Sequence, residues 1–107
     1  MAMLSFNAPG EREKSLWLVK KETNPNHSQW YIDRFKAMEA EGNDMAGESR
    51  LVNALASRGA KILDAGSGPG RVGKQLHALG HRVTGVDIDP ELIEEARRVC
   101  PDATWIT

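Results

Sequence analysis

The stretch KILDAGSGPG, residues 61–70, decides the fold of this 107-residue chain. A short apolar run leads into Asp64 and then into three closely spaced glycines. After them, apolar residues recur at helical spacing at Val72, Leu76 and Leu79, until Gly80 ends the pattern. This order predicts a strand, a tight loop and a helix.

The residues that follow repeat the alternation. HRVTGVD, residues 81–87, is rich in β-branched residues and predicts a second strand. Asp89 and Pro90 are typical of a helix start, with Glu94 and Arg98 spaced as an ion pair on its exposed side. Residues 103–107 begin a third strand. The prediction is an α/β fold: a partial doubly wound, Rossmann-like parallel sheet of about three strands, preceded by N-terminal helices.

The N-terminal half predicts helices without strands. We expect an arm over residues 1–27 with one short docked element at 16–19, followed by helices within residues 28–59. The first firm helix is predicted over 28–41, with Asn26 and Gln29 as a capping box. The second is predicted over 48–57, with Gly59 as its C-cap. Residues 60–107 then form the truncated βαβαβ unit.

Composition limits the partners and the compartment. The 14 Lys and Arg against 15 Asp and Glu give a net charge of −1, which favours neither nucleic acid nor an anionic membrane. A single cysteine, Cys100, is expected to be a small apolar filler and suits a reducing environment. Because no apolar run reaches the ~20 residues that span a bilayer, and no signal peptide is recognisable, we expect a cytoplasmic location.

The glycine loop and an acidic residue after the second strand predict a binding site. The loop lets a ligand approach the backbone, and the start of the following helix favours a phosphate or a carboxylate. Asp87 follows Gly66 by 21 residues, close to the spacing of roughly 20 residues expected for an acid that binds ribose hydroxyls. Together they predict a cofactor that contains adenosine.

The same residues also fit two other patterns. Residues 68–73 also fit the dinucleotide pattern G-x-G-x-x-G, but the charge of Asp64 opposes a pyrophosphate there and favours an ammonium group. Asp87 and Asp89 also have the spacing of an Asp-x-Asp metal site, but Asp89 is better explained as a helix N-cap, so we expect no metal. His77 and His81 are expected at the surface.

Residues 61–70, together with VDIDP at 86–90, resemble the cofactor-binding half of a class I S-adenosylmethionine-dependent methyltransferase. The resemblance implies that Asp64, Gly66 and Gly68 line the methionine end of S-adenosylmethionine, that Asp87 holds the ribose and that Ile88 packs on adenine. It also implies N-terminal helices that close over the cofactor, with additional contacts from Trp30, Tyr31 and Arg50. The predicted cofactor-binding residues are Asp64, Gly66, Ser67, Gly68, Gly70, Asp87 and Ile88.

The functional prediction is the N-terminal part of a methyltransferase that binds S-adenosylmethionine or S-adenosylhomocysteine. We expect the chain to be a fragment that is inactive alone, with an unknown methyl acceptor and no nameable catalytic residue. A non-catalytic nucleotide-binding or assembly module and an NAD-dependent oxidoreductase fragment are the alternatives. Because the first strand would be an unpaired edge of the sheet, the chain is also expected to self-associate through that edge.

Overall fold

The computed structural model describes residues 15–107. The prediction of an arm over residues 1–27 therefore lies partly outside the described residues. The elements in chain order are α1 (Leu16–Thr23), α2 (His27–Ala40), α3 (Gly47–Leu55), β1 (Lys61–Ala65), α4 (Arg71–Ala78), β2 (Arg82–Val86), α5 (Pro90–Val99) and β3 (Thr104–Ile106). No helix of this described part is long and apolar enough to cross a membrane.

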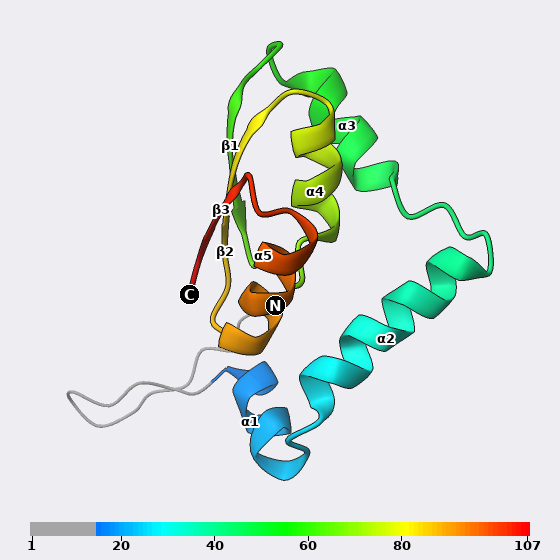
Figure 1. Ribbon diagram of the computed structural model, residues 1–107, viewed down its shortest axis with the longest axis vertical. Helices are drawn as coiled ribbons and strands as arrows, with labels where there is room; N and C mark the ends of the chain where they lie inside the picture. Colours follow the sequence, from blue (N-terminus) through cyan, green and yellow to red (C-terminus); the bar gives the residue numbers. More distant parts are fainter. Residues whose placement is uncertain (1–14) are drawn as a thin grey trace.

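The three strands form one parallel sheet in the order β1-β2-β3. The helices lie on one side of the sheet, and α1 and the start of α2 lie near the ends at which β1 and β2 finish (Figure 1). The opposite face is bare among the described residues and exposes Leu63 (68%) and Ile106 (48%). The predicted α/β fold with a three-stranded parallel sheet is thus confirmed, with β1 at an edge.

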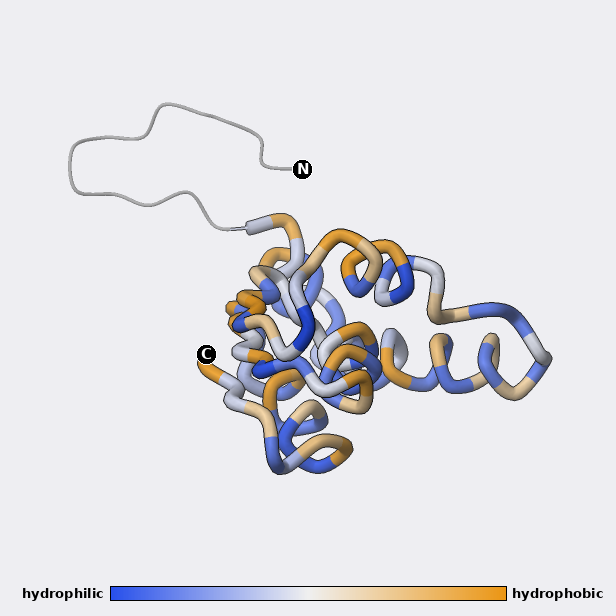
Figure 2. The backbone as a smooth tube through the Cα atoms, turned by 90° about the horizontal axis from the view of Figure 1, so that it is seen from above, coloured by the Kyte–Doolittle hydropathy of each residue, from blue (hydrophilic) through white to orange (hydrophobic). Residues whose placement is uncertain are grey.

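The helices that cover the sheet are amphipathic. Figure 2 shows hydrophobic and hydrophilic residues alternating along the helical turns. In α5, Leu92, Ile93 and Ala96 are buried, while Glu91 and Arg98 face solvent. Spacing of three to four residues places the apolar side chains on one face of the helix. Burial of this face against the sheet therefore holds α5 in place.

The centre of the core is the indole of Trp105, which is 5% exposed. Its Nε1–H donates to the Cys100 carbonyl at 2.7 Å, which satisfies the ring's one polar group. A Cβ added to Gly85 of β2 would lie 2.3 Å from the ring, and one added to Gly73 of α4 would lie 2.6 Å from it. Both glycines are therefore required by close approach of the ring. Cys100 is buried beside it, as expected for an apolar filler.

A buried histidine joins α3 to the sheet. His81 is 3% exposed; its Nδ1 accepts from the amide of Ala60 at 3.2 Å, and its Nε2 lies 2.8 Å from Oδ1 of Asn53. Because the Asn53 oxygen can only accept, Nε2 carries the proton. The prediction of a surface histidine at position 81 was wrong, since Asn53 and Ala60 satisfy both ring nitrogens inside the protein.

Three predicted local interactions differ from the structure. The Asn26 side chain makes no cap hydrogen bond, so the capping box with Gln29 is absent. Helix α3 ends at Leu55 with Ala56 as its C-cap, and Gly59 instead adopts a positive φ of 65° in the following turn. Arg98 pairs with Glu95 at 2.6 Å rather than with the predicted Glu94.

Gly85→Ala should destabilise the chain, because its new methyl group would collide with the Trp105 ring. Overpacking of this kind typically costs about 1–3 kcal/mol. We expect a lower thermal midpoint followed by circular dichroism. Gly47→Ala is the matched control: its Cβ would meet only the far end of Arg50 at 3.9 Å. An unchanged midpoint for Gly85→Ala would contradict the packing of Trp105 against β2.

Candidate functional site

The loop between β1 and α4 contains three glycines with left-handed backbones, which serve two different purposes. Gly66, Gly68 and Gly70 have φ of 78°, 58° and 89°. A Cβ on Gly66 or Gly68 would meet nothing within 4 Å, so their outer side is open. A Cβ on Gly70 would lie 3.0 Å from that of Ala96 and 3.1 Å from Trp105, so this glycine faces the core. Open space for a ligand therefore lies along Gly66 and Gly68.

The end of β2 holds the loop in shape. The amides of Gly66 and Ser67 both donate to the Val86 carbonyl, at 2.7 and 3.0 Å, and the amide of Gly68 donates to Oδ2 of Asp87 at 2.9 Å. The Ser67 side chain turns inward, and its Oγ is buried with no hydrogen-bond partner among the described residues. The side chain of this predicted site residue thus lies behind the loop, and its backbone is also engaged within the chain, since the Ser67 carbonyl accepts from the amide of Gly70 at 3.3 Å.

Asp87 has acceptor capacity left over for a ligand. Its Oδ2 accepts from Gly68, and its Oδ1 accepts from the amide of Asp89 at 2.9 Å. A carboxylate offers about four lone-pair positions, so about half of them take no donor from residues 15–107 and could accept from groups such as two ribose hydroxyls. The next side chain, Ile88, is 54% exposed. Asp87 and Ile88 therefore present an acceptor and an apolar surface side by side at the end of β2.

The Asp64 carboxyl at the end of β1 lies in a negative environment. Burial and the charges of Glu48 and Asp87 raise the pKa of Asp64, whereas Arg71 lowers it. Arg71 is itself engaged: it donates to the Met45 carbonyl at 2.7 Å and pairs with Glu48 at 2.8 Å. The site thus has an excess of negative charge that favours a positively charged ligand group.

Only one of the three helix residues suggested as further contacts lies in the electrostatic field of this site. The pKa of Tyr31 is raised by burial, with Arg71 opposing and Asp87 and Glu48 adding to the rise. Trp30 is 50% exposed and stacks on His27. Arg50 is held at the surface by Asp44. Tyr31 therefore lies within the influence of the charges of Arg71 and Asp87, whereas Trp30 and Arg50 are engaged by His27 and Asp44.

Asp89 is a residue whose full role the sequence did not reveal. It is the N-cap of α5, as predicted, and accepts from the Glu91 amide at 2.9 Å. Its carboxylate is also 0% exposed. Burial raises the pKa of this carboxyl, but hydrogen bonds from Lys21, Ser28, Trp17 and the Glu91 amide outweigh burial and hold the pKa at about 2. The three side-chain donors Lys21, Ser28 and Trp17 come from α1 and α2, which no local pattern indicates.

The site is an open cradle. The described part of the chain has a hollow of about 580 Å³ along the sheet and one of about 240 Å³ between α2, α4 and α5. Neither hollow is lined by Asp64, Gly66 or Asp87. Because Gly66 and Gly68 are open on their outer side, a ligand at the glycine loop would lie along the ends of β1 and β2.

Comparison with known proteins identifies the family. The fold and the site together define an α/β unit for binding a nucleoside-containing ligand. The model of the family described as "Methyltransferase domain" matches residues 62–107. A TehB-like SAM-dependent methyltransferase from Corynebacterium glutamicum is similar in structure, with a TM-score of 0.75, 50% identity and coverage of 78% of this chain and 46% of that one. The chain belongs to the class I S-adenosylmethionine-dependent methyltransferases.

Curated relatives agree with this assignment. The chain is 32% identical to a ubiquinone biosynthesis O-methyltransferase from Xanthomonas campestris, over 72% of this chain and 37% of that protein. A similar protein of the same name from Xanthomonas axonopodis is 31% identical, over 67% and 35%. The chain thus spans well under half the length of the relatives it matches. Neither the NAD-dependent oxidoreductase nor the non-catalytic module gains support from these comparisons.

Asp64→Asn should raise the thermal midpoint of the ligand-free chain at neutral pH. A carboxyl whose pKa is raised by folding destabilises the folded state when charged, and the amide removes that charge. The advantage of the variant should shrink as the pH falls through the raised pKa of the folded state and vanish below the unfolded value.

Asp44→Asn is the matched control. This exposed carboxyl pairs with Arg50, which helps to lower its pKa to about 2. Its removal should give no stabilisation at neutral pH. If both variants shift the midpoint equally, the negative environment assigned to Asp64 is wrong.

Proposed function

We propose that this chain forms the cofactor-binding part of a methyltransferase and binds S-adenosylmethionine across the ends of β1 and β2. The observation that carries the proposal is at Asp87: its carboxylate accepts from the amides of Gly68 and Asp89 and takes no further donor from the described residues, Gly68 is open on its outer side, and the neighbouring Ile88 is exposed. Asp87 would accept from the ribose hydroxyls, and Ile88 would pack on adenine.

The other end of the cradle suits the amino-acid part of the cofactor. Asp64 is a carboxylate in a field of excess negative charge, so it would attract an ammonium group. The open sides of Gly66 and Gly68 leave room for the chain that joins this group to the nucleoside. These positions support the predicted site residues Asp64, Gly66, Gly68, Asp87 and Ile88, whereas Ser67 and Gly70 would shape the loop.

When bound, S-adenosylmethionine supplies an electrophilic methyl group on a sulfonium. The contribution of this chain's own residues is to bind and orient: Asp87 fixes the nucleoside end, and Asp64 fixes the amino-acid end. Holding a reactant in one geometry lowers the entropic part of the barrier. The proposal extends to the whole protein, which would transfer this methyl group to an acceptor.

Asp87→Asn should weaken binding of S-adenosylhomocysteine, measured by isothermal titration calorimetry. The change keeps a side chain of the same size but removes the charge that strengthens hydrogen bonds from ribose, which costs about 1–3 kcal/mol. Titration of the unchanged chain with NAD is the ligand control, and no binding is expected.

Asp102→Asn provides the matched variant control, since this carboxylate is exposed and lies in the turn after α5. Its affinity for S-adenosylhomocysteine should equal that of the unchanged chain. Equal affinity of the Asp87 variant would remove Asp87 from the site, whereas preference for NAD would overturn the proposed cofactor.

We further propose that the isolated chain self-associates through β1 and the bare face beside it. β1 pairs only with β2 among the described residues, and Leu63 on it is 68% exposed. Unpaired strand edges with apolar side chains favour pairing with another chain.

Light scattering over a concentration series should show species larger than a monomer. Leu63→Lys should shift the population toward monomer, because a charge on the strand opposes close packing. Leu55→Lys is the control, since Leu55 is even more exposed (80%) but lies on α3. A monomer at every concentration, or equal effects of the two variants, would contradict this proposal.

A further inference from the structure

The Asp89 carboxylate gathers donors from three helices. Its Oδ2 accepts from Trp17 Nε1 and from Ser28 Oγ, both at 2.5 Å. Its Oδ1 accepts from Lys21 Nζ at 2.8 Å and from the Glu91 amide at 2.9 Å. Trp17 and Lys21 belong to α1, Ser28 belongs to α2, and Glu91 belongs to α5.

Capping α5 does not account for this arrangement. An N-cap needs one side-chain acceptor for an amide of the first turn, and the contact with Glu91 alone fulfils it. The other three donors reach Asp89 from 61 to 72 residues away in the sequence. A fully buried carboxylate is costly unless it is paired and hydrogen-bonded. The seating of α1 and α2 is thus coupled to the ionisation of Asp89.

A series of side-chain contacts connects Trp17, which donates to this carboxylate, with the candidate site. The Trp17 ring meets the Tyr31 ring edge-on at 5.2 Å between centroids. Tyr31 packs on Phe35 at 4.7 Å, and Phe35 lies 5.3 Å from the Arg71 guanidinium. Asp87 and Arg71 both act electrostatically on the Tyr31 hydroxyl. Displacement of Trp17 would therefore disturb Tyr31, the side chain of α2 on which the charge of Asp87 acts.

A second connection runs through the backbone. The amide of Asp89 donates to Oδ1 of Asp87, the proposed ribose acceptor. The turn over residues 87–89 thus connects Asp87, the proposed ribose acceptor, with Asp89, which accepts from α1 and α2.

We propose that Asp89 is a positioning residue that fixes α1 and α2 over the nucleoside end of the cradle, so that ligand affinity depends on a carboxylate that does not touch the ligand. This inference rests on the proposed binding of S-adenosylmethionine. It assigns α1 and the first turns of α2 the role of a cover, held by Asp89 and presenting Tyr31 to the site.

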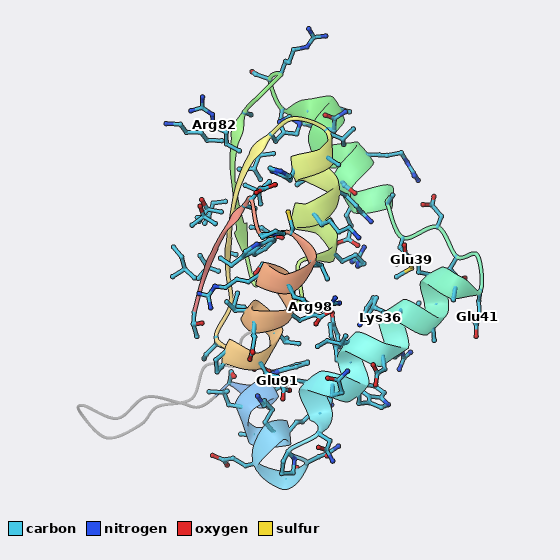
Figure 3. The ribbon with its side chains drawn as sticks, in the orientation of Figure 1. Lys36, Glu39, Glu41, Arg82, Glu91 and Arg98 are labelled. Atoms are coloured by element: carbon cyan, nitrogen blue, oxygen red, sulfur yellow. The ribbon has the colours of Figure 1, made fainter. Side chains whose placement is uncertain are left out.

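The test compares Asp89→Asn with Glu95→Gln. Asparagine still caps α5, since it is as good an N-cap as aspartate, but it has one acceptor oxygen and no charge for Lys21, Trp17 and Ser28. Glu95 is the matched control: it lies on the same helix and forms an ion pair with Lys36 of α2 at 3.4 Å. Lys36 extends from α2 near the opposite end of α5 from Glu91 (Figure 3).

Two measurements distinguish an effect on the docking of α1 and α2 from an effect on ligand affinity. Hydrogen exchange without ligand reports the docking of residues 16–40, and calorimetry reports affinity for S-adenosylhomocysteine. Asp89→Asn should raise exchange over residues 16–40, leave the sheet protected and weaken binding about tenfold or more, as expected when a buried charge pair loses one partner. Glu95→Gln should keep binding within about twofold, as for most partly exposed pairs.

Each other outcome has a definite meaning. Faster exchange with unchanged affinity would overturn the inference and leave the proposed function intact. Unchanged exchange would show that Asp89 does not hold the helices and would also overturn it. Absence of binding to the unchanged chain would overturn the proposed function itself.

A milder variant covers the case in which Asp89→Asn also loses protection of the sheet. Trp17→Phe removes one donor to Asp89 and keeps an aromatic ring beside Tyr31. It should weaken binding in the same direction by a smaller factor, and the indole N–H resonance of Trp17 in the unchanged chain should move when S-adenosylhomocysteine is added. Unchanged affinity and an unmoved resonance would overturn the inference.

Discussion

The indole of Trp105 fills the space that three glycines leave, and the position of the site depends on this contact. Gly85 brings β2 against the ring, Gly73 brings α4 against it, and Gly70 lets the start of α4 pass over it. A side chain at any of these glycines would separate the helix from the sheet. Since the loop at residues 66–70 is fixed between β1 and α4, its open side is placed by a residue of β3. The packing of the core therefore also determines the shape of the cradle.

Two carboxylates separated by a single residue have opposite environments. Asp87 keeps acceptor positions free at the surface of the cradle, whereas the acceptors of Asp89 are taken by donors from α1, α2 and α5. Local backbone geometry explains the pair, because the Asp89 amide bonds back to Asp87 and sets the turn into α5. The negative charges of Asp87 and Asp64 can interact with a ligand, whereas the charge of Asp89 is paired with donors within the fold.

The spacing of apolar residues and the positions of glycines predicted the helices and the glycine loop correctly, because contacts between residues close in the sequence determine them. The helices predicted over 28–41 and 48–57 correspond to His27–Ala40 and Gly47–Leu55, and the glycine loop lies between strand and helix as expected. The errors arose where distant residues decide the outcome. His81 is buried because Asn53 and Ala60 bond its ring, and Arg98 pairs with Glu95, which also binds Lys36 of α2. The Ser67 side chain is buried and Gly70 faces the core. Both follow from packing against residues distant in the sequence, which the glycine motif does not indicate.

Ligand binding requires little ordering of the glycine loop. Amides of Gly66, Ser67 and Gly68 are already bonded to the end of β2 and to Asp87, so the loop is ordered before any ligand arrives. A preformed site does not lose conformational entropy when it is filled. The N-terminal helices differ, because their contact with α5 is centred on Asp89 and its donors. A carboxylate that holds its charge down to a pKa of about 2 keeps this contact over the ordinary pH range. The free energy that seats α1 and α2 is therefore supplied by the fold, and a ligand at Asp87 would bind against a cover already in place.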